Sequence, residues 1–290
     1  DRSSPATVPS SPSKIRLNTI GGESFAQTGQ FITWKFEVTQ AGLYTFAFKW
    51  RQNIQRGLTS VRRVILDNEV PCAELNQVEF PYGGGWNLDT LGDGTSDYRF
   101  FLDEGWHEIT LEVTLGDMGK VVRLAQHSME ELNRIYRRIL MITGSTPDIN
   151  RDYHFEKLIA GDLEALAEQA AALESICDEV EAITGSRGAN VASVTGVARQ
   201  CLRFSNKPED IAKGFSVFKT NLGALGTWIM SIASQPLEID YLIVQPAGTP
   251  LPRADASFLQ SVWHELQMFA YSFVEDYNSV ADTAAVDNYR

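Results

Sequence analysis

Alternating apolar and polar residues mark the first part of the chain. Residues 31–38 read Phe-Ile-Thr-Trp-Lys-Phe-Glu-Val, and residues 43–50 read Leu-Tyr-Thr-Phe-Ala-Phe-Lys-Trp. Two such period-2 runs joined by a short turn with a glycine predict a β-hairpin. Further strands are predicted at 60–66, 70–74, 98–102 and 106–114, with turn residues between them. Many short strands in this arrangement are typical of a β-sandwich or jelly roll.

The pattern changes to helical spacing near residue 116. Apolar residues recur every three or four positions from 118 to 142, and similar patterns follow at 163–183, 190–204 and 208–232. Segments of this length and number predict a small helical bundle. Residues 236–246 then read as a short apolar strand bounded by prolines. Because a lone strand leaves its backbone groups unpaired, we expect this strand to complete the earlier sheet.

The order of these patterns predicts an α+β protein. Its architecture is an antiparallel β-sandwich (jelly roll) with an inserted α-helical bundle and a C-terminal helix. The expected division is a Ser/Pro-rich linker at 1–13, the sandwich at 14–115 plus 236–250, the bundle at 116–235, the C-terminal helix at 251–280 and a tail at 281–290.

Aromatic residues inside the predicted elements are expected to lie in the core. Trp34 and Trp106 fall within strands, so packing is their expected role. The last helix carries an aromatic and aliphatic stripe that includes Trp263, Phe269, Tyr271 and Phe273. An exposed stripe of this size would be a liability, so it too is expected to pack inward.

Composition narrows the class of ligand. The 290 residues carry a formal net charge of -12. An acidic surface repels phosphate backbones and anionic lipids, which argues against nucleic-acid binding and against membrane attachment by charge. A neutral sugar remains compatible with this charge. The three cysteines, at 72, 177 and 201, show no CxxC spacing and indicate neither a zinc site nor a disulfide framework.

Motifs for catalysis are missing from the sequence. HExxH, GxSxG, the Walker A loop and GxGxxG do not occur, and the four histidines show no metal-ligand spacing. Carboxylates are plentiful, but most fall in turns and on helix faces, where solvated charge is the usual role. Asp89, Asp93 and Asp97 lie in a glycine-rich loop without EF-hand spacing and read as turn formers. We therefore expect no catalytic residue.

Two stretches carry the residue mixture that binds sugars. Aromatic rings stack on the C–H faces of sugars, while amides and charged groups supply directional hydrogen bonds. The candidate ligand-binding residues are Trp50, Arg51, Gln52, Asn53, Tyr82, Trp86 and Asn87. The glycines at 83–85 place Trp86 on a predicted loop, where packing against the sandwich is the competing interpretation.

Several phrases resemble known families. The segments 41–46, 103–111 and 237–244 resemble galactose-binding-like jelly rolls of carbohydrate-binding modules. A broader resemblance covers nearly the whole chain and links it to the N-terminal region of large extracellular solute-binding proteins of carbohydrate ABC importers in Gram-positive bacteria. The phrases that carry it are RGLTSVRR at 56–63, EFPY at 79–82, ELNRIYRR at 131–138, MITG at 141–144, NLGALGTW at 221–228 and FVEDYNS at 273–279.

The resemblance implies a segment of a surface lipoprotein that lies upstream of a periplasmic-binding-type domain. It implies an extracellular, cell-surface location, and it assigns no functional residue. Modules of the jelly-roll class often hold a structural calcium ion with oxygen ligands from the first and last strands. Glu23 and Asp240 stand where such ligands are expected.

Three functions follow as hypotheses. The first is a non-catalytic carbohydrate-binding accessory module for uptake of polysaccharide or oligosaccharide. The second is a structural spacer or protein-docking module that contacts other surface or transporter proteins. A glycoside hydrolase fragment ranks third because no catalytic constellation is visible. A solvent-exposed platform of Trp50 and Trp86 would favour the first hypothesis, and a buried platform with an exposed apolar helical patch would favour the second.

Overall fold

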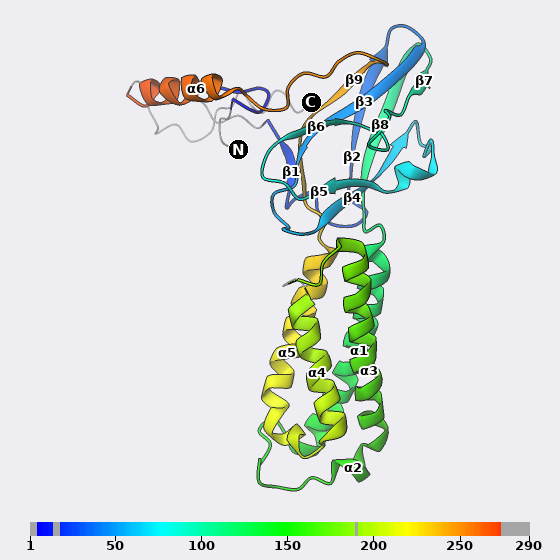
Figure 1. The fold of residues 1–290 in the computed structure, drawn as a ribbon, viewed down its shortest axis with the longest axis vertical. Helices are drawn as coiled ribbons and strands as arrows, with labels where there is room; N and C mark the ends of the chain where they lie inside the picture. The colour runs from blue at the N-terminus through cyan, green and yellow to red at the C-terminus, as the bar shows by residue number, and fades with distance from the viewer. Residues whose placement is uncertain (1–4, 14–17, 189–190, 274–290) are drawn as a thin grey trace. The chain divides into compact units, whose positions relative to one another are not determined.

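A computed structural model describes residues 5–13, 18–188 and 191–273 (Figure 1). The chain divides into two compact units, one of residues 1–114 and 235–290 and one of residues 115–234. The first unit contains the sheets and the second the long helices, so the predicted α+β sandwich with a helical insertion is confirmed. The predicted tail at 281–290 lies outside the described residues.

Two antiparallel sheets form the first unit in the part of the chain that the structure describes. One sheet has the order β1-β9-β3-β6, with β7 also paired to β3, and the other has the order β2-β8-β4-β5. The strands are β1 (Ile20–Gly22), β2 (Phe31–Val38), β3 (Gly42–Arg51), β4 (Thr59–Leu66), β5 (Val78–Pro81), β6 (Asn87–Thr90), β7 (Phe100–Leu102), β8 (Gly105–Thr114) and β9 (Leu237–Pro246).

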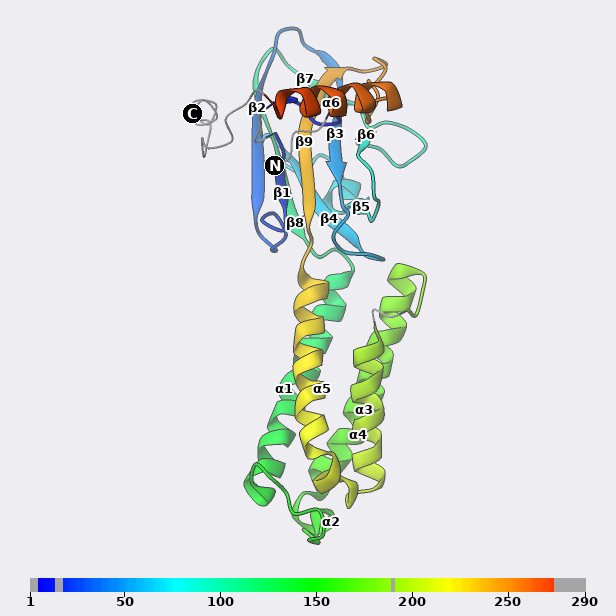
Figure 2. The ribbon, with the colours of Figure 1, turned by 90° about the vertical axis from the view of Figure 1, so that its left-hand side faces the viewer.

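Strand β9 lies between β1 and β3 and pairs with both (Figure 2). The prediction that this late strand completes the sheet is therefore confirmed. The prediction of a strand at 70–74 is wrong: these residues form a turn that leads into the short 3-10 helix η1 (Ala73–Asn76). Pro71 lies inside this segment and has no N–H to donate to a strand ladder. The turn at Asp67 and Asn68, both with positive φ, has already ended β4.

The inner faces of the sheets meet in one core. Burial alternates along β8, as the alternating sequence predicts. In β3, Phe46, Phe48 and Trp50 lie in the core, and the intervening residues 45, 47 and 49 are buried on the opposite face. Aromatic rings join the sheets, with Trp34 against Phe48 at 5.8 Å and Phe36 against Phe46 at 5.7 Å between centroids. Trp34 is half-buried against this core as expected. Trp106 is 71% exposed, so its assignment to the core is wrong, because its position in β8 points to the outer face.

The second unit is a bundle of long helices that run side by side (Figures 1 and 2). They are α1 (Met118–Thr143), α3 (Ala160–Thr184), α4 (Ala192–Asn206) and α5 (Asp210–Ala233), with the short α2 (Phe155–Leu158) before α3. Each long helix turns its apolar residues inward. One buried carboxylate, Asp162, is held by Arg134 and Arg138 at 2.9 and 3.1 Å.

The chain re-enters the sandwich at Gln235, and a buried arginine fixes this point. Arg62 of β4 is fully buried, and its guanidinium donates to the backbone oxygens of Gln235 at 2.7 Å and Phe25 at 2.8 Å. The side-chain oxygen of Gln235 accepts from the Val61 backbone N–H at 2.9 Å. The backbone N–H of Gln235 donates to the Ala26 carbonyl oxygen at 2.8 Å. Burial lowers the pKa of Arg62 to about 9, still above neutral pH, so the side chain stays charged.

We predict that Arg62→Ala destabilises the sandwich by on the order of 2–5 kcal/mol, because it leaves buried carbonyl groups without donors. Arg63→Ala is the matched control, because Arg63, the next residue in β4, pairs with Glu112 on the outer face, where such an ion pair contributes about 0–1 kcal/mol. Urea unfolding of both variants measures the difference. Equal losses in the two variants would contradict the role given to Arg62.

A second charged group, His107 of β8, lies against the end of β4. Its ring stacks on Phe36, and its Nδ1 and Nε2 lie 2.7 Å from Asp67 Oδ2 and 3.0 Å from the Asp103 carbonyl oxygen. Both partners are acceptors, so the ring satisfies them only when both nitrogens carry protons. The hydrogen bond to Asp67 is the main cause that raises the pKa of His107.

This raised pKa predicts a pH-dependent contribution to stability. The contribution is complete below the unfolded-state pKa of about 6.5 and is lost as the pH rises through the higher folded-state value. Because Asp67 is 45% exposed, we expect only about 0.5–1 kcal/mol. His107→Gln should therefore lower the free energy of unfolding more at pH 5.5 than at pH 8.5. A loss that is the same at both pH values would contradict this account.

Candidate functional site

Trp50 does not form an exposed platform. It faces the core from β3, is 5% exposed and packs edge-on against Phe80 with 5.1 Å between ring centroids. Its indole Nε1–H donates to Asp89 Oδ2 at 3.0 Å. Trp50 therefore anchors a carboxylate at the sheet edge, and little of its ring is exposed.

Trp86 is also buried, on the opposite side of the same sheet. It is 8% exposed, and its ring lies under the Arg51 guanidinium at 4.6 Å and the Lys49 ammonium at 5.6 Å. Lys49 and Arg51 alternate with Trp50 along β3, so they point away from the core. Trp50 and Trp86 therefore do not form the predicted platform, because their rings lie on opposite faces of the sheet.

The remaining polar candidates of the first stretch are engaged in local structure. Arg51 pairs with Glu238 of β9 at 2.6 Å. Gln52 is buried and bonds the backbone of Ile54, Gln55 and Leu58, so it shapes the loop that follows β3. Asn53 is exposed in that loop. These residues support the sandwich and do not line its cleft.

Tyr82 and Asn87, in contrast, line a cleft of about 1190 Å³. It opens between β5 and β6, the edge strands of the two sheets on one side of the sandwich. Core residues form its floor, and aromatic, amide and carboxylate side chains form its rim. The floor includes Phe48, Trp50, Leu75, Phe80 and Leu91, and the rim includes Asn76, Gln77, Tyr82, Asn87 and Tyr98.

The loop between β6 and β7 forms one wall of this cleft. Asp93 accepts the backbone N–H groups of Thr95 and Ser96, both at 2.8 Å, and the Thr95 hydroxyl at 2.7 Å. These bonds, the Thr95 hydroxyl first, hold the pKa of Asp93 well below its usual range. A side chain at Gly92 would collide with the Ser96 backbone oxygen. Asp93 thus fixes this turn, as predicted. The fixed turn holds Tyr98, at the end of the loop, on the cleft rim.

The cleft is electrically negative. Among the described residues it is lined by no lysine, arginine or histidine, and its carboxylates are Glu74, Glu79, Asp89, Asp93 and Asp97. Burial and then the charges of Glu74 and Asp93 raise the pKa of the Tyr98 hydroxyl. No ion pair within the described residues neutralises these carboxylates. The arrangement suits an uncharged ligand with many hydroxyl donors and disfavours an anionic one.

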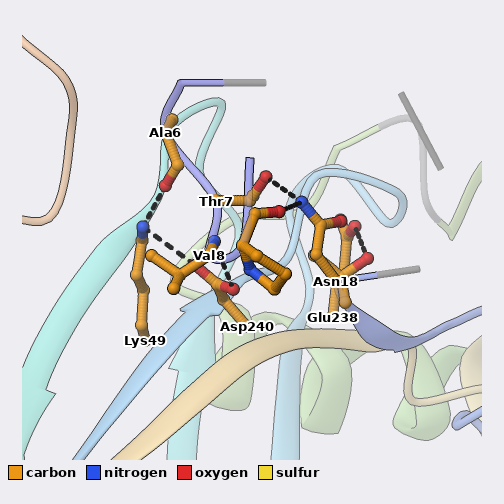
Figure 3. Close-up of polar contacts among 9 residues, drawn as sticks. Ala6, Thr7, Val8, Asn18, Lys49, Glu238 and Asp240 are labelled. Carbon is orange, nitrogen blue, oxygen red and sulfur yellow. Dashed lines mark hydrogen bonds and ion pairs between the residues drawn. The ribbon is translucent and has the colours of Figure 1, made fainter. Parts of the chain in front are cut away.

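The two residues expected to bind calcium, Glu23 and Asp240, lie in different surroundings. Asp240 is the extra residue of a β-bulge in β9, opposite Lys49, and its fully buried carboxylate meets the Lys49 ammonium at 2.9 Å (Figure 3). The backbone N–H of Val8 donates to the same carboxylate at 3.0 Å, and Lys49 also donates to the Ala6 backbone oxygen. Glu23 lies exposed in the turn after β1. The described residues contain no group of three or more His, Cys, Asp and Glu side chains that could hold a metal ion.

This cluster also gives the N-terminal residues a structural role. The segment 5–13, expected as a linker, lies on the outer face of the β9 sheet through Ala6, Val8 and the Asn18 amide, which donates to the Pro9 carbonyl oxygen at 2.9 Å (Figure 3). A bulge commonly redirects a side chain, and here it turns Asp240 toward Lys49.

Sequence reasoning missed the greater part of the cleft. Asp89, Tyr98 and the residues of η1 and β5 were not chosen as ligand candidates. Their strands are three or four residues long, too short for a visible period. The glycine-rich loop before Tyr98 was the available signal, because loops fixed by turn residues often carry binding groups.

Comparison with known proteins identifies a relative of the bundle. Residues 120–232 match the family model of the bacterial solute-binding protein 4-helix bundle domain. The resemblance to solute-binding proteins is thereby confirmed for the inserted unit. None of the helices among the described residues is long and apolar enough to cross a membrane. No match was found among curated proteins.

Several solved structures similar to this chain align over about a third of its length. A family 35 carbohydrate-binding module from Clostridium thermocellum aligns with 34% of this chain and 79% of its own, at 15% identity and a TM-score of 0.27. A second family 35 module, from an environmental isolate, aligns with 30% of this chain and 56% of its own, at 22% identity and a TM-score of 0.22. The chain spans only 15% of a Paenibacillus cycloisomaltooligosaccharide glucanotransferase that it matches over 34% of itself, at 21% identity and a TM-score of 0.27.

The Lys49–Asp240 pair predicts the response to calcium. Because Asp240 is already neutralised, we expect neither added calcium nor a chelator to change the unfolding temperature. Calorimetry of the wild-type chain and of Asp240→Asn tests this. A calcium-dependent rise in the unfolding temperature that Asp240→Asn removes would contradict this prediction and indicate a calcium site at Asp240.

Proposed function

We propose that this chain is a non-catalytic carbohydrate-binding accessory module of an extracellular, cell-surface solute-binding protein. Its ligand is an uncharged oligosaccharide or polysaccharide, bound in the cleft between β5 and β6. The cleft is the observation that carries the proposal, because it joins an apolar floor to a rim of aromatic rings, amides and carboxylates that form no ion pair among the described residues. The match of the bundle to solute-binding proteins supports the setting.

Sugar recognition fits the chemistry of the rim. Tyr82 is 42% exposed and Tyr98 is half-buried, so both offer ring surface to the C–H face of a sugar. Asn87 offers both a donor and an acceptor, and Asp89 is oriented by the indole of Trp50. The carboxylates of Glu79 and Asp97 supply further acceptors for sugar hydroxyl groups.

Two carboxylates of the cleft, Glu74 and Asp93, do not resemble the proton donor of a glycosidase. A glycosidase needs one carboxylic acid whose pKa is raised so that it can donate a proton. The pKa values of Glu74 and Asp93 are lowered by hydrogen bonds, in Glu74 chiefly from its own backbone. This direction favours permanently ionised acceptors and a binding role without bond cleavage.

The rival function is a structural spacer or protein-docking module. It gains support from the burial of Trp50 and Trp86, which removes the predicted platform, and from exposed apolar side chains on the last helix. The cleft and that helix involve different residues, so separate experiments test them.

Affinity electrophoresis of the whole chain in gels that contain galactomannan, xylan or soluble β-glucan tests the proposed function. We expect at least one neutral polymer to retard the chain and polygalacturonate to leave it unaffected, because the cleft carboxylates repel uronates. Tyr82→Ala and Tyr98→Ala should each weaken retardation about 3–10-fold through loss of ring contact.

Trp106→Ala is the matched control, because Trp106 is an exposed aromatic residue on the outer face of β8, outside the cleft. Retardation lost in Trp106→Ala but kept in Tyr82→Ala would place the sugar outside the cleft and refute the assignment. No retardation by any neutral polymer would refute the carbohydrate function. Release of reducing sugar from a polymer would instead support a hydrolase.

A further inference from the structure

Helix α6 (Phe258–Tyr271) is amphipathic, and its apolar side faces solvent. The helix begins with a capping box in which Ser257 and Gln260 bond each other's backbone. Leu259, Trp263 and Leu266 follow the four-then-three spacing of a helix-packing seam, which Phe273 extends. Together with Phe258 and Phe269 they form the α6 stripe. The exposed fractions of its side chains are 80% for Phe258, 77% for Leu259, 62% for Trp263, 56% for Leu266, 67% for Phe269 and 73% for Phe273.

The opposite side of α6 is polar and partly covered. His264 is 6% exposed, and Ser261 and Gln267 are half-buried. A surface helix normally turns its apolar stripe inward and its polar side outward. The expectation that Trp263, Phe269, Tyr271 and Phe273 pack in the core is therefore wrong, because within the described residues nothing covers them. An apolar stripe of this kind indicates an interaction surface.

Charge distinguishes between the surfaces that the stripe could meet. From 258 to 273 the only ionisable side chains besides Tyr271 are His264 and Glu265. Helices that lie on membranes usually carry lysine and arginine on their polar side, and α6 has none. A chain with a net charge of -12 repels its own copies, and an uncharged stripe is a place where two copies can meet without that repulsion.

The area of the stripe is sufficient for a weak interface between two copies. At about 150–250 Å² per aromatic side chain, its four exposed rings offer on the order of 500 Å² per copy. Two facing stripes would thus bury on the order of 1,000 Å² from the rings, close to the lower limit of roughly 1,200 Å² for specific interfaces. Leu259 and Leu266 add to this area.

We propose that the α6 stripe is a self-association surface, against which the α6 stripe of a second copy packs. A two-fold axis brings the same residues of both copies together, so Trp263 and Leu266 would meet their own counterparts or each other. This pairing goes beyond the carbohydrate function and does not depend on it, since the cleft and the stripe share no residue.

Sedimentation velocity of the whole chain at concentrations from about 1 to 300 μM, the range of a weak interface, tests this proposal. We expect the mass to rise from one chain of 32.2 kDa toward twice that value. Leu266→Glu should weaken the dimer roughly tenfold or more, because it brings two like charges into the apolar seam. Met268→Glu adds the same charge outside the stripe and should leave the dimer unchanged, while circular dichroism checks that both variants keep their helix.

Each other outcome overturns the proposal. A monomer throughout the range means that no second copy binds. A dimer that Leu266→Glu leaves intact forms through another surface. A monomer that floats with phosphatidylcholine vesicles, and loses this property in Leu266→Glu, assigns the stripe to a lipid surface instead.

Discussion

The buried guanidinium of Arg62 is the contact on which the fold depends most. An insertion of 120 residues separates β9 from the strands that it joins, so the sandwich closes only if the returning chain is fixed in register. Arg62 supplies that fixed point by binding the carbonyl groups of Gln235 and Phe25, and Ser60 adds a bond of 2.6 Å to Pro236. A charge buried without a carboxylate is costly, and it is tolerated here because carbonyl oxygens surround it.

The consequences reach the candidate binding cleft. With β9 in the middle of its sheet, β3 lies one strand from the edge, and its residues Phe48 and Trp50 reach the cleft floor. Trp50 then orients Asp89 on the edge strand β6. Sheet edges are sites that proteins normally blunt or cover. Here the short strands β5 and β6 bound a cleft whose carboxylates also discourage pairing with another chain.

The sequence predicted the long elements well because their periods extend over many residues. The alternation in β2, β3 and β8 and the spacing in the bundle helices each repeat several times, and the lone strand β9 was placed by its need for partners. Short elements such as η1, β5 and β6 carry no such period. The candidate cleft was predicted only in part: Trp50, Tyr82 and Asn87 line it, whereas Trp86 lies on the opposite side of the sheet from Trp50.

Exposure of aromatic residues was the hardest property to predict. Trp106 and four aromatic residues of the last helix, Trp263, Phe269, Tyr271 and Phe273, were expected in the core on the general rule that large apolar side chains are buried. The rule fails where an element has an outer face or lacks a partner, and neither fact is visible in a local pattern. Both departures occur on surfaces, which is where binding functions are expected to disturb the ordinary pattern.

The central claim is that the cleft between β5 and β6 binds an uncharged sugar. A crystal structure of the whole chain grown with a mixture of neutral cello-, manno- and xylo-oligosaccharides tests it most directly. The account predicts sugar density against Tyr82 and Tyr98, with hydroxyl groups bonded to Asn87 or Asp89. Density at another surface, or an empty cleft at saturating sugar, would contradict it.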